Sequence, residues 1–278
     1  MIKNILATVD GSAYSNAVVG QSLYLAKKYN AFLRFLTILD VRIYEWAVSI
    51  GADGFMPAIP ISTYQKETQK FLEEKAGEVL KKCAQRAEHE QVEFNTVKVA
   101  GSPVEVICEQ ARMVDLIIMG RRGEYARWSR GLMGATLDGT VREAHKPILV
   151  LPKEHRDIKK LLLAYDCSPQ ANHALQFAAD LADRLESSVV VLAVNDDEAL
   201  ARRAIQEALE YLRPYDLNVE SQISGGGAGE AILSACEALG TDLVVMGAHG
   251  HTRLREALLG STTEEVLRKI EIPLLLAR

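Results

Sequence analysis

The sequence predicts an α/β protein built from two repeated, open, doubly wound parallel-sheet domains, each with about five strands and flanking helices. Two observations favour this class. Short, continuous apolar runs alternate with amphipathic stretches of helical spacing, which is typical of strands that helices cover on both faces. The same landmarks also recur in the same order in both halves of the 278-residue chain, which indicates a duplication.

The repeat is defined by three pairs of landmarks. In each half, an early apolar run ends in an aspartate, a later one ends in Met-Gly, and the last follows a proline. These landmarks are Asp10 and Asp166, Gly120 and Gly247, and the runs 147–151 and 273–277. They predict one domain over 1–152 and a second over 157–278, joined by a short charged linker.

Ten short, apolar runs, some of them interrupted by polar residues, are expected to form the strands. The ranges are 2–9, 32–39, 94–99, 115–119 and 147–151, then 160–165, 188–194, 217–222, 242–246 and 273–277. Apolar residues at helical spacing over 72–87 and 174–185 predict helices between them. Ser168 followed by Pro169 is typical of a helix start, with the proline in the first turn.

The first half carries extra residues after its second strand. The aspartates of the repeat are 156 positions apart and the Met-Gly pairs 127, so the first half is about 29 residues longer between them. We place the surplus in a loop over 41–62, which contains Trp46 and Phe55. Packing against the other half or another subunit is one interpretation, and a lid over a ligand is the other.

Charge and composition exclude several classes. The net charge is −5, with +3 over 1–153 and −8 over 154–278, so neither half has the basic character of a nucleic-acid binder. No uncharged run approaches the ~20 apolar residues of a membrane span, and the start lacks the features of a signal peptide. We therefore expect no membrane association and a cytoplasmic location. Four scattered cysteines without a Cys-x-x-Cys pair indicate reduced thiols and no metal site.

A glycine motif follows the fourth predicted strand of the second half. Gly247 ends that strand, Gly250 permits a tight turn and close approach to a ligand, and Gly260 precedes the next helix. A helix N-terminus presents free N–H groups and the positive end of its dipole, so it favours a phosphate. The alternative is two tight turns followed by an ordinary serine cap at Ser261.

Together with Asp166, this Gly-x2-Gly-x9-Gly-Ser motif resembles the nucleotide signature of the universal stress protein family, and the resemblance covers nearly the whole chain as a tandem. In ATP-binding members, the early aspartate and the residue two before it contact the nucleoside. A backbone group on the second strand contacts adenine, and the glycine loop holds ribose and phosphates. The resemblance thus implies a site at Ala164, Asp166, Val194, Gly247, Gly250, Gly260, Ser261 and Thr262.

The first half departs from this pattern. Ten residues rather than nine separate Gly123 from Gly134, and Ala135 stands where serine or threonine is expected. Thr136 follows and could supply the hydroxyl if the loop bulges. The resemblance gives a second candidate site at Thr8, Asp10, Ile38, Gly120, Gly123, Gly134, Ala135 and Thr136.

Arginines crowd the loop after Gly120, where Arg121, Arg122, Arg127 and Arg130 flank Trp128. This basic, aromatic loop could clamp a phosphate or stack on a base. The alternative is a solvated loop with Trp128 packed against the protein.

The resemblance implies a stress-response or signalling protein that binds ATP, with or without Mg²⁺, or else ADP or AMP, in its second domain. It would act as a nucleotide-dependent switch or scaffold for an unknown protein partner. No catalytic residue is assigned, since the chain lacks a Walker lysine. A slow ATPase or other phosphoryl-transfer enzyme, and a nucleotide-free scaffold, remain the alternatives. Pairing of the last strands, 147–151 and 273–277, would form an intramolecular pseudo-dimer, and two chains could form a homodimer.

Overall fold

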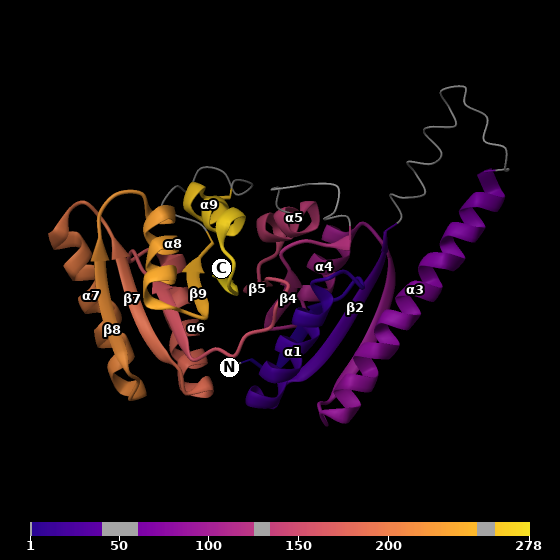
Figure 1. Ribbon diagram of the computed structural model, residues 1–278, viewed down its shortest axis with the longest axis horizontal. Helices are drawn as coiled ribbons and strands as arrows, with labels where there is room; N and C mark the ends of the chain where they lie inside the picture. Colours follow the sequence, from indigo (N-terminus) through magenta and orange to yellow (C-terminus); the bar gives the residue numbers. More distant parts are fainter. Residues whose placement is uncertain (1, 41–60, 125–133, 249–258) are drawn as a thin grey trace, which may run out of the picture.

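A computed structural model describes residues 2–40, 61–124, 134–248 and 259–278. Its ten described strands form one continuous sheet, in the order β3-β2-β1-β4-β5-β10-β9-β6-β7-β8 (Figure 1). The two halves of the sequence contribute five strands each. The α/β class and the repeat expected from the sequence are confirmed.

Strands and helices alternate along each half. In the N-terminal half they are β1 Asn4–Thr8, α1 Ser15–Tyr29, β2 Phe32–Asp40, α3 Ile61–His89, β3 Phe94–Gly101, α4 Pro103–Ala111, β4 Leu116–Gly120, α5 Ala135–Glu143 and β5 Ile148–Leu151. In the C-terminal half they are β6 Lys160–Ala164, α6 Pro169–Leu185, β7 Ser188–Val194, α7 Glu198–Leu212, a 3₁₀ turn Arg213–Tyr215, β8 Val219–Ser224, α8 Ala228–Leu239, β9 Leu243–Gly247, α9 Ser261–Lys269 and β10 Leu274–Ala277.

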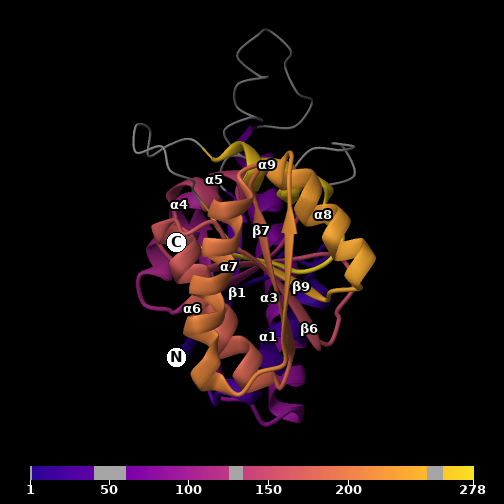
Figure 2. The same ribbon diagram turned by 90° about the vertical axis from the view of Figure 1, so that its left-hand side faces the viewer.

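The helices cover both faces of the sheet and bury a core on each side. One core includes side chains of α1, α3, α6 and α7, and the other includes side chains of α4, α5, α8 and α9. Figure 2 shows α6 and α7 to one side of the strands and α8 to the other. Because both faces are buried, the central strands read as mainly apolar runs in the sequence, whereas the edge strands β3 and β8 are partly exposed and contain polar residues.

The halves meet at the centre of the sheet, where β5 and β10 pair antiparallel with Leu149 opposite Leu275. All other strand pairs among the described residues are parallel. The pairing of last strands that we expected is therefore present within one chain. Helices α1 and α6 also approach each other across the halves, with the Arg184 guanidinium 5.9 Å from the Tyr29 ring centroid.

A repeated carboxylate ties the start of the first strand of each half to the strand beside it. The Asp115 carboxylate accepts from the backbone N–H groups of Lys3 and Asn4, at 2.8 and 2.9 Å. Asp242 accepts from the backbone of Lys159 and Lys160 in the same way, at 3.0 Å each. The two halves thus repeat their side-chain contacts as well as their strands.

The extra residues of the first half form a loop only in part. Residues 41–60 of the segment predicted as a loop over 41–62 lie outside the described residues, and α3 already begins at Ile61. The helix has 29 residues against the 15 of its counterpart α7, so 14 of the extra residues are helical. Its N-terminal end projects past the sheet in Figure 1. The prediction missed this start because the apolar spacing is clear only from Leu72 onward.

Among the described residues, no helix is both long and apolar enough to cross a membrane. The same residues contain no group of three or more histidine, cysteine or carboxylate side chains that could hold a metal ion.

Candidate functional site

A cavity of about 450 Å³ lies in the N-terminal half, where β1, β2 and β4 reach their carboxyl ends. From β1 the chain moves outward to β2 and β3 and then returns to β4 on the other side of β1. This change in strand order is where open α/β sheets bind ligands. All eight residues of the candidate site in this half line the cavity: Thr8, Asp10, Ile38, Gly120, Gly123, Gly134, Ala135 and Thr136.

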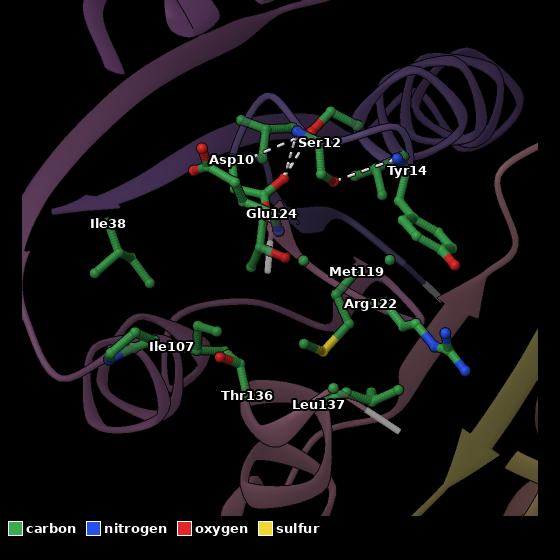
Figure 3. Close-up of a pocket in the computed structure, with 18 of the residues that line it drawn as sticks. Asp10, Ser12, Tyr14, Ile38, Ile107, Met119, Arg122, Glu124, Thr136 and Leu137 are labelled. Carbon is green, nitrogen blue, oxygen red and sulfur yellow. Dashed lines mark hydrogen bonds between the residues drawn. The ribbon is translucent and has the colours of Figure 1, made fainter. Parts of the chain in front are cut away.

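The cavity joins apolar walls to a polar rim (Figure 3). Ile38 of β2, Ile107 of α4 and Met119 of β4 supply apolar surface. Asp10 and Ser12 lie across the cavity from them, in the turn after β1. A volume and lining of this kind suit a small ligand with one flat apolar part and one polar part.

Asp10 holds three segments of the chain together beside the cavity. Its Oδ1 accepts from the Ser12 backbone N–H at 2.9 Å and from the Ser15 hydroxyl at 3.0 Å. Its Oδ2 accepts from the Glu124 backbone N–H at 2.8 Å, in the loop after β4. A carboxylate can accept about four hydrogen bonds, and donors among the described residues supply three to Asp10.

The glycines of the loop are needed because other groups lie too close for a side chain. A Cβ on Gly120 would lie 2.6 Å from the Tyr14 Cβ, and one on Gly123 would lie 2.9 Å from the Asp10 Oδ2. Gly134 is the N-cap residue of α5, so the first N–H groups of that helix face the cavity region. Ala135 and Thr136 lie in the first turn of α5, whereas residues 125–133, where the loop could bulge, lie outside the described residues.

Helix α3 completes the rim, and the motif did not reveal this. Leu72 lines the cavity, and the Lys75 ammonium forms an ion pair with the Glu124 carboxylate of the glycine loop. The helical spacing that includes Leu72 was visible in the sequence. Its placement over the cavity was not, because it depends on how α3 crosses β2 and β3.

The C-terminal half places its candidate residues at the equivalent positions. Ala164, Val194 and Gly247 end β6, β7 and β9, and the Asp166 Oδ1 accepts from the Ser168 backbone N–H at 3.0 Å. Gly260 is the N-cap residue of α9, whose first turn contains Ser261 and Thr262. Gly250 lies outside the described residues. A Cβ on Gly247 would lie 2.8 Å from the Gln170 Cβ, compared with 2.6 Å for the nearest atom at Gly120.

Arg121 and Arg122 are the described arginines of the basic loop after Gly120. The Arg121 guanidinium donates to the backbone carbonyl of Ile270, at the end of α9 in the other half. Arg122 lines the cavity, whereas Arg127, Trp128 and Arg130 lie outside the described residues.

Comparison with known proteins gives consistent matches. The model of the universal stress protein family matches residues 1–152, 157–206 and 197–278. Universal stress protein Slr1230 of Synechocystis is 33% identical over 298 residues, with 100% of each chain covered. Universal stress protein Rv2005c of Mycobacterium tuberculosis is 22% identical over 300 residues, covering 99% of this chain and 96% of that protein.

A crystal structure of a universal stress protein from Archaeoglobus fulgidus has the same fold. It aligns with a TM-score of 0.76 at 23% identity and covers 99% of this chain and 96% of that one.

Proposed function

This chain belongs to the universal stress protein family, and we propose that it is a stress-response or signalling protein that binds an adenine nucleotide in each half. ATP, with or without Mg²⁺, is the first candidate, and ADP and AMP are the others. The sites would lie in two domains, 1–152 and 157–278. Occupancy would favour one conformation or assembly, which a protein partner reads.

The observation that carries this proposal is the cavity in the N-terminal half. Eight residues chosen from the sequence motif, spread from Thr8 to Thr136, line one space at the switch point of the sheet. The residues come from separate strands, loops and a helix whose ends meet at this edge of the sheet. Their convergence supports nucleotide binding even though Ala135 replaces the expected hydroxyl.

The groups in the cavity match the parts of an adenine nucleotide. Ile38, Ile107 and Met119 would pack against the faces of the base. The remaining acceptor position of Asp10 would take a ribose hydroxyl. The free N–H groups at the start of α5, with the Thr136 hydroxyl, would bind phosphate, as the positive end of a helix dipole favours an anion.

In the C-terminal half the proposal rests on the complete motif and on the equivalent positions of its described residues. Ser261 supplies the hydroxyl that Ala135 lacks, in the first turn of α9. If the two sites differ in affinity, we expect the C-terminal site to bind more tightly for this reason.

Two of the three described carboxylates that line the N-terminal cavity, Asp10 and Glu124, favour binding over fast hydrolysis; the third is Asp40. Asp10 is occupied by three donors of the chain, and Glu124 is paired with Lys75. Neither is placed as an available base for an attacking water. A slow ATPase remains the alternative, and steady release of phosphate that scales with protein concentration would support it.

Calorimetric titration of nucleotide-stripped protein with Mg-ATP tests the proposal. We expect about two sites per chain. The Gly250→Val variant should lose the C-terminal site, because a side chain would enter the phosphate position. A matched control is Gly77→Val on α3, where an added Cβ meets no atom within 4 Å. No binding of ATP, ADP or AMP by the folded wild-type chain would overturn the proposal and favour a nucleotide-free scaffold.

A further inference from the structure

We propose that the two nucleotide sites are coupled through Arg121, so that filling one tightens the other. This inference rests on the proposed function. It concerns the regulation of those sites and not their existence. Arg121 belongs to the glycine loop of the N-terminal half, and its side chain ends on a helix of the C-terminal half.

The N-terminal end of this link is part of the first site. Arg121 lies between Gly120 and Arg122, which both line the cavity. Its backbone N–H donates to the Leu151 carbonyl at 2.9 Å, which fixes the main chain to the end of β5. A ligand that contacts Gly120 and Arg122 would therefore bear on the main-chain segment that carries the Arg121 side chain.

The other end of the link is helix α9. Ile270 is the C-cap residue of α9 and is 3% exposed, and its carbonyl accepts from the Arg121 guanidinium. A cation at this end of a helix satisfies a free carbonyl and opposes the negative end of the dipole. The opposite end of the same helix begins with Ser261 and Thr262 of the second candidate site. Nine residues of rigid helix, about 13 Å, thus separate the Arg121 contact from that site.

Helix α9 is also held at its N-terminal end. The Thr263 hydroxyl donates to the Ala248 carbonyl at 3.1 Å, directly after Gly247. In Figure 1, α9 and α5 lie side by side over the junction of the halves. A shift at the C-terminal end of α9 would therefore reach the loop that follows β9.

In the repeat, the residue equivalent to Arg121 has no side chain that could make this contact. Ala248 occupies the position of Arg121 in the C-terminal half, and its N–H donates to the Ala277 carbonyl at 2.8 Å, as that of Arg121 does to Leu151. Ala144 occupies the position of Ile270, with closely similar backbone angles. The backbone of the link is thus duplicated, but a methyl group replaces the guanidinium. Among the described residues, the link therefore runs from the N-terminal loop to the helix of the other half, and the resulting coupling of affinities must be reciprocal.

Two-site titration with Mg-ATP measures the coupling. In the wild-type chain, filling one site should tighten the other by about fivefold or more, the lower end of typical allosteric coupling. Arg121→Met keeps the side-chain stem and removes the hydrogen-bond donor. In this variant, filling one site should change the affinity of the other by less than about twofold. The control Arg268→Met removes an arginine of α9 that pairs with Glu264 in the same helix and is 53% exposed. It should retain wild-type coupling.

Hydrogen exchange provides a second readout that does not need two active sites. In a Gly250→Val chain, ATP at the N-terminal site should slow exchange of the Ile270 amide, and adding Arg121→Met should abolish this effect. Two independent sites, a single site, or coupling that persists in Arg121→Met would each overturn the inference while leaving nucleotide binding intact. Absence of any binding would overturn the proposed function as well.

Discussion

At the scale of residues, individual carboxylates and glycines determine how the loops around the site are held. Asp10 joins the turn after β1, the start of α1 and the loop after β4, while Gly123 leaves room for the Asp10 carboxylate. The aspartate and the glycines could be predicted from the sequence because a local motif carries them. The contacts of Lys75 with Glu124 and of Arg121 with Ile270 could not, because each joins residues whose proximity exists only in the folded chain.

Asp10→Asn should destabilise the fold by about 1–3 kcal/mol. The new amide nitrogen cannot accept a hydrogen bond, so at least one of the three donors loses its partner. Urea denaturation, with the curves fitted to a common m-value, would measure the change in the free energy of unfolding. The control is Asp157→Asn, in the linker with a 67% exposed side chain, which should change stability by less than about 0.5 kcal/mol. Equal effects of the two substitutions would contradict the role of Asp10.

Cys83 should be inert in the native chain. Burial disfavours its thiolate and raises its pKa to about 11, with the nearby Arg86 opposing the shift only in part. Since the thiolate is the reactive form, alkylation by iodoacetamide at pH 8 should be about 100-fold slower than in urea-unfolded protein. Mass spectrometry of quenched samples would measure the rate. Similar rates in the two states would show that the thiol is accessible.

At the scale of elements, the strands could be predicted closely and the helices less so. Continuous apolar runs mark the buried strands, and β5 and β10 begin within one residue of the predicted starts. The start of α3 was missed because its first turns lack the apolar spacing that a fully packed helix shows. Its crossing over the cavity also depends on tertiary contacts that no local pattern records.

Two helix pairs show how the repeats maintain one close contact in different ways. In the N-terminal half, a Cβ on Gly139 of α5 would lie 2.6 Å from a methyl group of Val104 on α4. In the C-terminal half the glycine is on the other helix, and a Cβ on Gly229 of α8 would lie 2.2 Å from the Glu265 carboxylate of α9. The glycine thus lies on the second helix of the pair in the N-terminal half and on the first helix in the C-terminal half, and the larger residue lies on the other helix in each case.

Gly139→Glu should therefore destabilise the N-terminal half by about 1–3 kcal/mol through overpacking against Val104. Adding Val104→Gly recreates the pair found in the C-terminal half and should recover most of the loss, despite the helix cost of the new glycine. A double-mutant cycle from chemical denaturation gives the interaction energy, expected at about 0.5–3 kcal/mol. Additive effects would show that the two helices do not contact there.

For the whole molecule, the central feature is one sheet shared by both halves. The apolar last strands and their edge position predicted the pairing of β5 with β10. The register and the contacts of α1 with α6 could not be predicted, because they follow from how the two faces pack once the sheet has formed. A shared sheet links the unfolding of one half to that of the other.

Leu275→Ala should lower the stability of both halves together. Leu275 is 1% exposed and lies opposite Leu149 at the junction, so truncation should cost about 2–5 kcal/mol. Scanning calorimetry should show one transition that shifts as a whole. Leu200→Ala, at a 51% exposed position on α7, is the control and should leave the melting curve in place. Two separate transitions, with one of them unshifted, would contradict a core that is shared by the two halves.

The central claim is that the N-terminal cavity binds an adenine nucleotide. The most direct test is to measure binding to this cavity alone. The measurement is a calorimetric titration of Gly250→Val with Mg-ATP, after circular dichroism has shown that the chain is folded. The eight converging residues predict about one remaining site per chain. That site should disappear when Gly123→Val is added, because the new side chain would meet the Asp10 carboxylate. A folded Gly250→Val chain that gives no heat of binding would contradict the assignment of the cavity.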